Sequence, residues 1–372
     1  MNMENNIKDI FVEKLDSNMS ISEFVDEGFR WFNLKDFPQA VFGFPWFEHE
    51  KLYRRLPENP MYKIPEMVDV LANCTSGGQI RLCTDSCRLA IQVQLLGPSN
   101  MVHMPATGQC GFDCYVDIGH GMKYCSTTKY NMKNSNYEFL FFDWDFSVPL
   151  KKVLINFPLY QGVEDVWIGV DNTATVLQPY PFESKKKAVF YGSSITQGGC
   201  ASRPGMSYTN ILSRLFNMEC INLGFSGNGK GEPELAELIS TINDLDLIVL
   251  DYEANSWKNN LYQKTLQNFI GILRAKYVDI PVLVVSKLPY SDEVFNQKKA
   301  QIRKDNLIFQ KSLIDNLKKQ GDRHLYFLDG SGLLGSDFNE CMVDGVHPTD
   351  LGFYNIAHNM SGVIGDILAL SV

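Results

Sequence analysis

The second half of the chain alternates short apolar segments with amphipathic ones, and this alternation constrains the fold more than any other feature. Five strand-like segments lie at residues 188–191, 220–223, 247–250, 282–285 and 324–328. Helical patterns separate or follow them at residues 206–217, 233–242, 260–276, 297–319 and 349–370. Because helices between consecutive apolar strands indicate parallel strands covered on both faces, we predict a three-layer α/β domain.

Before residue 180 the pattern differs, because short β-like runs are broken by Gly, Asn, Asp and Pro. Candidate strands are residues 79–83, 89–95, 112–118, 137–144, 152–157 and 166–170. The first two flank the turn residues Thr84, Asp85 and Ser86, which predicts a β-hairpin. Short strands at this spacing favour an all-β, jelly-roll-like sandwich. A chain of 372 residues is long enough for two domains, which we place at residues 1–182 and 183–372.

The charge balance excludes one broad class of function. The net charge is −9, whereas a non-specific nucleic-acid binder needs basic patches that neutralise phosphates. The longest basic run is residues 185–187, which we interpret as a solvated linker. The N-terminus lacks a basic stretch followed by an apolar one, and no run approaches the ~18 apolar residues of a spanning helix. We therefore expect a cytoplasmic protein with neither nucleic acid nor membrane as a partner.

Nine cysteines are scattered along the chain, and this odd number does not resemble a disulfide framework. The pairs Cys83/Cys87 and Cys110/Cys114 have a spacing that zinc ligands can have. Both pairs lie in strand-like stretches, where residues four apart are separated by about 13 Å. Turns could still bring the members of a pair together. We favour buried free cysteines over a metal site, and predict no bound metal.

Polar residues gather where the predicted parallel strands end. Residues 192–198 follow the first strand, 224–229 the second and 251–256 the third, while 344–348 precede the last helix. In open parallel sheets, ligand sites form beyond the carboxyl ends of the strands. These segments supply a serine hydroxyl, glycine-rich backbone, an asparagine amide and a carboxylate–imidazole pair. That set of groups is what acyl transfer requires.

His347 is the histidine best placed to act as a base. It alone among the six histidines combines a carboxylate three residues away, Asp344, with a segment flanked by both Gly and Pro. An imidazole can take the proton of a serine hydroxyl, and its other nitrogen needs an acceptor such as a carboxylate. Asp344 could instead cap the last helix, although Thr349 is a better candidate for the cap.

These segments resemble the sequence blocks of SGNH/GDSL-type serine hydrolases. Residues 192–198 are similar to the Gly-Asp-Ser-Leu-like block, with Ser194 at the nucleophile position, and 222–227 place the oxyanion glycine at Gly227. Residues 253–256 match the third block only at Asn255, whereas Asp344 and His347 match the Asp-x-x-His block in full. The resemblance implies a flavodoxin-like SGNH domain with a Ser194–His347–Asp344 triad. It also implies that Ser194, Gly227 and Asn255 form the oxyanion hole.

The chain further resembles a bacterial subgroup of this family that carries an N-terminal β-sandwich. Residues 111–115 are similar to its Gly-x-Asp-Leu-Tyr signature, with Cys114 in place of Leu, and residues 157–163 also match. The resemblance covers residues 70–370.

Departures from the family pattern leave alternatives open. Ser193 stands where aspartate is usual, so it is an alternative nucleophile, and Gly224 is an alternative oxyanion donor. Arg203, in the loop after the nucleophile, and Glu253, in the third block, are candidate substrate-binding residues. A surface ion pair is the alternative for Arg203.

We therefore predict a serine esterase that removes an O-acyl group, with acetyl favoured, from a carbohydrate. Its partner would be a small-molecule or oligosaccharide ester, and the reaction would need no metal or organic cofactor. An acyltransferase with the same triad is one alternative, which product analysis with competing alcohols would separate. A non-catalytic carbohydrate-binding protein is the other, and the intact Ser194, Asp344 and His347 argue against it.

Overall fold

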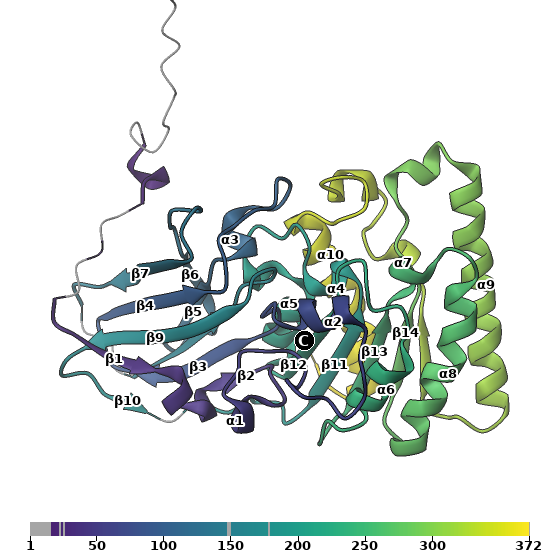
Figure 1. Cartoon of the computed structure of the whole chain (residues 1–372), viewed down its shortest axis with the longest axis horizontal. Coiled ribbons are helices and arrows are strands. Elements are labelled where there is room, and N and C mark those ends of the chain that lie inside the picture. The colour runs from purple at the N-terminus through teal and green to yellow at the C-terminus, as the bar shows by residue number, and fades with distance from the viewer. Residues whose placement is uncertain (1–15, 22–23, 25–26, 147–149, 178, 372) are drawn as a thin grey trace, which may run out of the picture.

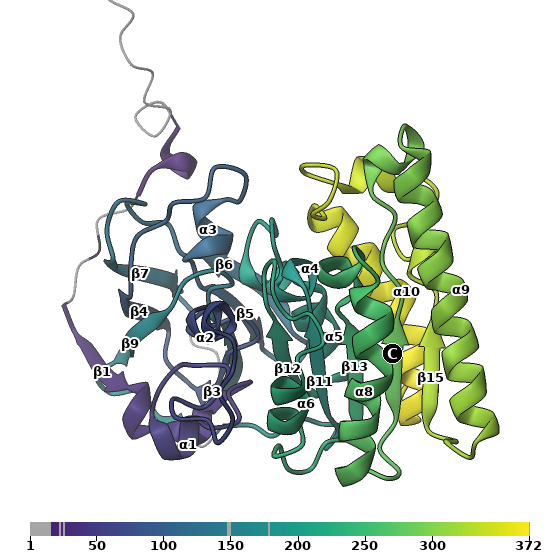
Figure 2. The same ribbon diagram turned by 45° about the vertical axis from the view of Figure 1, so that its right-hand side comes forward.

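Antiparallel strands build the first half of the chain and parallel strands the second in this computed structural model (Figure 1). The structure describes residues 16–21, 24, 27–146, 150–177 and 179–371. The antiparallel region lies at the left of Figure 2 and the parallel region at the right. The predicted order, a β-sandwich followed by an α/β domain, is confirmed.

The N-terminal region is a sandwich of two antiparallel sheets. The first sheet contains β1 (Phe29–Asn33), β9 (Val163–Asp171), β4 (Arg88–Leu95) and β7 (Asn136–Asp143), in that spatial order. The second contains β10 (Val176–Leu177), β3 (Gln79–Thr84), β8 (Lys151–Asn156), β5 (Asp113–Asp117) and β6 (Lys123–Thr127), with β2 (Val41–Phe42) beside β3. Short helices are α1 (Phe47–Glu50), α2 (Glu66–Ala72) and α3 (Ala106–Gln109). The facing sides enclose a core that includes Ile80, Ile91, Phe112, Val153 and Val166.

The predicted hairpin around residues 84–86 is wrong. β3 pairs with β2, β8 and β10, whereas β4 pairs with β7 and β9 in the opposite sheet. The turn therefore carries the chain from one sheet to the other. Ser86 fixes this crossing, because its hydroxyl lies 2.8 Å from Asp171 Oδ2 at the end of β9. An alternating sequence has the same period whichever sheet the neighbouring strand joins, so the pattern could not distinguish the two arrangements.

The C-terminal region is a parallel five-stranded sheet between two layers of helices. Its strands are β12 (Glu219–Gly224), β11 (Lys187–Gly192), β13 (Leu247–Asp251), β14 (Val282–Val285) and β15 (Leu325–Leu328), in spatial order. Helices α5 (Tyr208–Phe216) and α10 (Asp350–Leu368) pack on one face. Helices α6 (Pro233–Ile239), α8 (Leu261–Lys276) and α9 (Gln297–Lys319) pack on the other. All the strands and helices predicted after residue 182 are confirmed to within a few residues.

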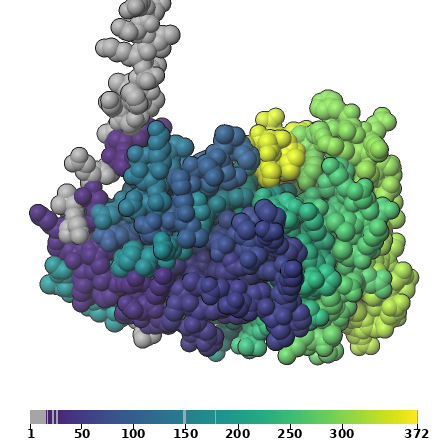
Figure 3. Space-filling view, in the orientation of Figure 1, coloured from purple at the N-terminus to yellow at the C-terminus, as the bar shows by residue number. Residues whose placement is uncertain are grey.

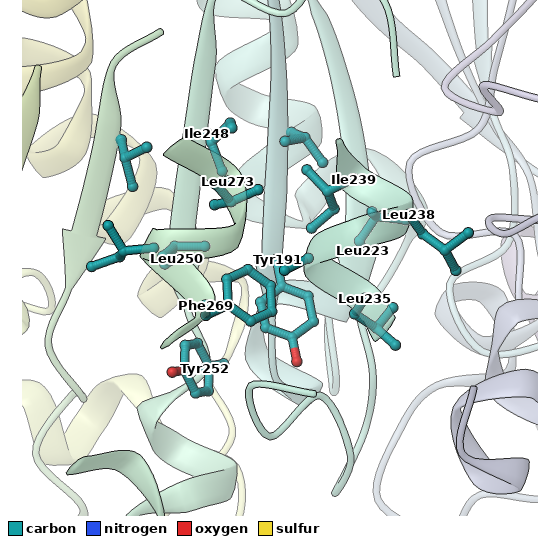
Figure 4. Close-up of a cluster of buried hydrophobic side chains, with 14 of the residues drawn as sticks. Tyr191, Leu223, Leu235, Leu238, Ile239, Ile248, Leu250, Tyr252, Phe269 and Leu273 are labelled. Carbon is teal, nitrogen blue, oxygen red and sulfur yellow. The ribbon is translucent and has the colours of Figure 1, made fainter. Parts of the chain in front are cut away.

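The core under α6 and α8 shows why these strands are continuously apolar. Tyr191 of β11 stacks on Phe269 of α8 at 4.7 Å between ring centroids, beside the buried ring of Tyr252 (Figure 4). Leu223 and Leu250 from the flanking strands are also fully buried in this cluster. A strand covered by helices on both faces has no side chain that must face water.

Residues 51–73 of the N-terminal half pack on the C-terminal region. Leu56, Val68 and Ala72 are fully buried in the same apolar cluster as the strands of the parallel sheet. Arg55 is also fully buried, and its guanidinium donates to the carbonyls of Leu71 (2.7 Å) and Gly224. Figure 3 shows this dark blue-violet segment lying against the teal and green surface of the α/β region. The two regions therefore share apolar core.

No helix among the described residues is both long enough and apolar enough to cross a membrane. All nine cysteines are free thiols, in agreement with the absence of a disulfide pattern in the sequence.

Candidate active site

The turn between β11 and the short helix α4 (Ser194–Gln197) separates the two adjacent serines. The Ser193 hydroxyl accepts the N–H of Ile195 and caps α4, and only 1% of Ser193 is exposed. Ser194 is 8% exposed, and its Oγ lies 2.9 Å from His347 Nε2. Gly192 makes this tight turn possible, because an added Cβ would lie 1.9 Å from Thr196 Oγ1. The turn follows β11, which lies between β12 on one side and β13 on the other, so the strand order reverses there. In open parallel sheets, ligand sites form at such a reversal.

His347 and Asp344 come from the loop before α10. His347 Nδ1 lies 2.7 Å from Asp344 Oδ2, while Asp344 Oδ1 accepts the N–H groups of Val346 (3.0 Å) and His347 (2.8 Å). Burial alone would raise the pKa of Asp344, but these hydrogen bonds outweigh it and hold the pKa below its usual value. Thr349, rather than Asp344, caps α10 by accepting from Gly352 N. Ser194, His347 and Asp344 thus form one continuous chain of polar contacts.

Ser194 N and Gly227 N are the two backbone groups predicted to donate to an oxyanion. Ser194 N lies at the start of α4, and Gly227 has a left-handed φ of +64°. No heavy atom lies within 4 Å of a Cβ built on Gly227, so the space beside this residue is open. Gly224 is enclosed instead, because a Cβ there would lie 2.2 Å from Gln197 N. Of the two glycines, Gly227 has the room that a substrate oxygen would need.

The side chain of Asn255 is engaged with the glycine-rich loop. Asn255, in the short helix α7 (Glu253–Ser256), donates from Nδ2 to the carbonyls of Phe225 (3.0 Å) and Asn228. Both of its amide hydrogens therefore have acceptors in this arrangement. Asn255 holds the loop that carries Gly227, and a direct bond from Asn255 to an oxyanion would require one of these contacts to open.

Arg203 makes polar contacts with the sandwich, and the prediction that it binds substrate stays a prediction. Its Nη1 donates to Asp113 Oδ2 (2.6 Å) and to the Tyr115 hydroxyl (2.5 Å), and its guanidinium lies 4.1 Å from the centroid of the Tyr124 ring. Asp113 Oδ2 also accepts the N–H of Gly205 at 2.8 Å. Arg203 therefore docks the loop after the nucleophile onto the sandwich. Asp113 and Tyr115 are the Asp and Tyr of the Gly-x-Asp-Leu-Tyr-like segment.

Glu253 is 1% exposed and points into the interior. The prediction that it binds substrate is therefore corrected. Its carboxylate accepts from Lys287 N (2.7 Å), Asn306 Nδ2 (3.0 Å) and Gln310 Nε2 (2.9 Å). Burial raises the pKa of Glu253 despite these bonds. Glu253 ties α7 to α9 and to the end of β14, and it has no access to a substrate.

Three residues that sequence reasoning missed border the site from the sandwich. The Tyr160 hydroxyl donates to the Ser194 carbonyl (3.1 Å), and Ser76 Oγ donates to the Gln197 carbonyl (2.6 Å). His103 Nε2 lies 3.9 Å from Asp344 Oδ2. Tyr160 lies within residues 157–163, which matched the subgroup, so a signal for it existed. The sequence contained no such signal for His103, because the position of this side chain depends on how the two regions pack.

The residues that could hold a metal ion are not the two cysteine pairs whose spacing zinc ligands can have. Cys83/Cys87 and Cys110/Cys114 belong to no cluster of candidate ligands within the described ranges. One cluster is found there, formed by His103, Cys200, Asp344 and His347, whose ligand atoms all lie within 4.8 Å of one another. Burial, with a contribution from Asp344, raises the pKa of the Cys200 thiol to about 12, so the thiol is protonated at neutral pH.

Comparisons with known proteins match both regions of the chain. A model of the GDSL-like lipase/acylhydrolase family matches residues 185–365, and a model of the N-terminus of SGNH-hydrolase-type esterases, GxDLY, matches residues 29–176. A protein from Bacteroides ovatus described as a GDSL-like lipase is similar in structure, with a TM-score of 0.83 and 29% sequence identity. That likeness covers 92% of this chain and 99% of the other. No protein of curated function matches the chain in sequence.

Two more distant solved structures share the fold. A salicylyl-acyltransferase from a tetracycline biosynthetic pathway has a TM-score of 0.71 at 20% identity, covering 92% of this chain and 99% of its own. A family two carbohydrate esterase from Clostridium thermocellum, solved with cellohexaose, has a TM-score of 0.58 at 14% identity. That likeness covers 79% of this chain and 93% of the esterase chain. The common architecture is therefore compatible with more than one kind of acyl chemistry.

Proposed function

Since this chain belongs to the GDSL-like lipase/acylhydrolase family of SGNH-type ester hydrolases, we propose that it is a serine esterase that removes a short O-acyl group, acetyl by preference, from a carbohydrate. Ser194 would be the nucleophile, His347 the general base and acid, and Asp344 the partner of the imidazole. Ser194 N and Gly227 N would bind the oxyanion, with Asn255 as a further donor once it is released from the loop.

The observation that carries the proposal is the contact chain from Ser194 Oγ through His347 to Asp344, at 2.9 Å and 2.7 Å. In the first half-reaction, Ser194 Oγ attacks the ester carbonyl while Nε2 of His347 takes the hydroxyl proton. Nε2 then returns that proton to the departing alcohol, and the acyl group stays on Ser194. Water repeats the sequence and releases the acid. Asp344 holds the imidazole in the tautomer with its proton on Nδ1 and stabilises the imidazolium.

The proposal that the alcohol is a carbohydrate draws on the sequence resemblance to esterases with an N-terminal sandwich. The clostridial carbohydrate esterase, whose structure contains cellohexaose, shows that a protein of this fold can bind an oligosaccharide. We also propose that residues 1–182 and 183–372 act as two units, the second holding the reacting groups and the first limiting what reaches them.

The test is hydrolysis of a short-chain chromogenic ester, and then of acetylated oligosaccharides, by wild type, Ser194→Ala and Ser193→Ala. Ser194→Ala should lower kcat by about 10⁴-fold or more. Ser193→Ala should keep turnover within about tenfold and lose about 1 kcal/mol of stability, because it removes a helix cap. If Ser193→Ala were inactive while Ser194→Ala remained active, Ser193 would be the nucleophile. An inert wild type would reject hydrolysis.

Acyl transfer is the second candidate, since the salicylyl-acyltransferase shares the two-region architecture at similar coverage. The same acyl-enzyme would then pass its acyl group to an alcohol instead of water. Product analysis with competing sugars and alcohols separates the two functions. Free acid as the dominant product supports the esterase, and a new ester at low alcohol concentration supports the transferase.

A further inference from the structure

Two side chains beside the proposed triad have no part in the proposed chemistry. His103 lies with its ring centroid 5.9 Å from that of His347 and its Nε2 3.9 Å from Asp344 Oδ2. Cys200 is a free, buried thiol. The ligand atoms of His103, Cys200, Asp344 and His347 all lie within 4.8 Å of one another.

Contacts outside the cluster hold the backbone segments that carry both extra side chains. His103 comes from the sandwich loop after β4, whose residues Asn100 and Met101 donate their N–H groups to Gln109 Oε1 at 2.9 and 3.1 Å. Cys200 lies in the turn after α4, between Gly199, whose N–H binds the Ser194 carbonyl at 2.8 Å, and Ala201, whose N–H binds the Gly198 carbonyl at 3.1 Å. This turn keeps Cys200 at a φ of +76°, a conformation that residues other than glycine rarely adopt.

The chemistry of the four groups selects one class of ligand. A thiolate, two imidazoles and a carboxylate are the donors that Zn²⁺ takes, whereas Mg²⁺ and Ca²⁺ prefer oxygen alone. Around a tetrahedral zinc with bonds of about 2.0–2.3 Å, ligand atoms are separated by about 3.4 Å. The most widely separated of the four ligand atoms, which lie within 4.8 Å of one another, would need to approach by about 1.4 Å. The side chain of His103, 39% exposed, can make that movement without repacking a core.

We propose that His103, Cys200, Asp344 and His347 form a reversible inhibitory site for a thiophilic divalent cation such as Zn²⁺. The inhibitory part rests on the proposed function, because two of the ligands belong to the proposed triad. The sandwich supplies His103, the α/β region supplies the other three ligands, and the ion therefore bridges the two regions.

Binding would change no oxidation state. The Cys200 thiol releases its proton to solvent, a sulfur–metal bond forms, and coordinated water leaves the ion. The ion also takes Asp344 Oδ2 and one nitrogen of His347. If that nitrogen is Nε2, Ser194 loses its base, and if it is Nδ1, the imidazole loses its bond to Asp344. Either arrangement stops proton transfer, and removal of the ion by a chelator restores it.

Binding can be tested without turnover, by titrating Cd²⁺ into the metal-free protein and following the ultraviolet cadmium–thiolate absorption. Wild type and Ser194→Ala should both show one tight site, because Ser194 is not a ligand. Cys200→Ser should lose this signal, and His103→Asn should bind at least about tenfold more weakly. Cys87→Ser makes the same change at a half-buried cysteine of the sandwich and should behave as wild type. Equal signals in Cys200→Ser and Cys87→Ser would overturn the site.

Inhibition is tested by adding Zn²⁺ during ester hydrolysis and then removing it with a chelator, each variant being compared with its own metal-free rate. Wild type and Cys87→Ser should lose turnover and recover it fully. Cys200→Ser and His103→Asn should need at least about tenfold more Zn²⁺ for the same loss. Equal sensitivity in all four proteins would overturn the proposal. If no ester is hydrolysed, the proposed function fails, while the cadmium titration still decides the metal site.

Discussion

The two regions that meet at Ser194 contribute contacts of different kinds. From the α/β region come the hydroxyl, imidazole and carboxylate that can exchange or hold a proton. From the sandwich come hydrogen bonds that end on backbone or on Arg203: Tyr160 on the Ser194 carbonyl, Ser76 on the Gln197 carbonyl, and Asp113 on Arg203. The sandwich also brings His103 Nε2 to 3.9 Å from Asp344 Oδ2. A bond to a carbonyl fixes where a turn lies and leaves the acidity of the hydroxyl to its neighbours. In the proposed chemistry, reactivity would belong to one region, whereas positioning would be shared by both.

The largest expected effect tests the reactive side. Asp344→Asn keeps the shape of the side chain but favours the wrong imidazole tautomer, and we expect kcat to fall by about 10⁴-fold. The measurement is steady-state hydrolysis of a chromogenic ester, with circular dichroism to verify folding. Asp366→Asn makes the same change at an exposed position of α10 and should leave kcat unaltered. An Asp344→Asn enzyme with a tenth of the wild-type kcat would mean that this carboxylate does not hold the base.

The next effect tests the positioning side, at a buried carboxylate between the two regions. Asp113 is fully buried and holds both Arg203 and the N–H of Gly205, so Asp113→Ala leaves a guanidinium without its partner. We expect a loss of about 3–5 kcal/mol in the free energy of unfolding, measured with urea. Arg203→Met combined with Asp113→Ala should recover part of the loss, because the Arg203 guanidinium that lost its partner is then absent. A loss below about 1 kcal/mol in Asp113→Ala would show that Arg203 is not needed for docking.

The same contrast explains how far the sequence could predict the molecule. Strands 188–191 and 247–250 were identifiable because helices cover both faces of the sheet and every position favours an apolar residue. The order of sandwich strands was not, since β3 and β4 carry the same alternation whether they pair with each other or cross between sheets. The contacts of Arg203 and Glu253 escaped prediction for a related reason. Their nearness in sequence to the nucleophile blocks did not determine the direction of their side chains.

The residues of the proposed triad were identifiable because they lie at strand or helix ends that the topology brings together. Ser194 was separated from Ser193 only by the family pattern, and the structure adds a physical reason, since Ser193 caps α4. Tyr160 was marked only by the family resemblance of residues 157–163, and His103 was marked by no pattern in the sequence. Their contacts join loops of one region to turns of the other, and such contacts depend on the final packing of both.

A smaller effect contrasts Asp113 with a partly buried carboxylate inside the α/β region. Asp251, at the end of β13, has hydroxyl donors, Tyr208 (2.9 Å) and Thr196 (3.0 Å), and burial raises its pKa to about 7. The unfolded chain ionises this group near pH 4, so the folded state holds the extra proton between about pH 4 and 7. Stability should therefore fall as pH rises through this window, with about 2 kcal/mol lost from pH 5 to 7 through this group.

Asp251→Asn removes that titration, because an amide keeps an acceptor for the two hydroxyls and has no proton to lose. We expect the difference in free energy of unfolding between pH 5 and 7 to shift by about 2 kcal/mol in favour of pH 7, relative to wild type. Urea unfolding at both pH values measures it. Asp366→Asn, exposed on α10, should keep the wild-type pH dependence. An unchanged pH dependence in Asp251→Asn would show that Asp251 is already ionised at pH 5.

The smallest effect separates positioning from reactivity at a single bond. Tyr160→Phe removes the hydroxyl that donates to the Ser194 carbonyl and leaves the ring in place. A neutral hydrogen bond contributes about 1 kcal/mol, so we expect kcat to fall by roughly fivefold. If the bond acts on position, the pH profile of kcat should keep its shape while its height falls. A displaced profile would mean that Tyr160 alters the protonation of His347, and the sandwich would then share in the chemistry as well as in its placement.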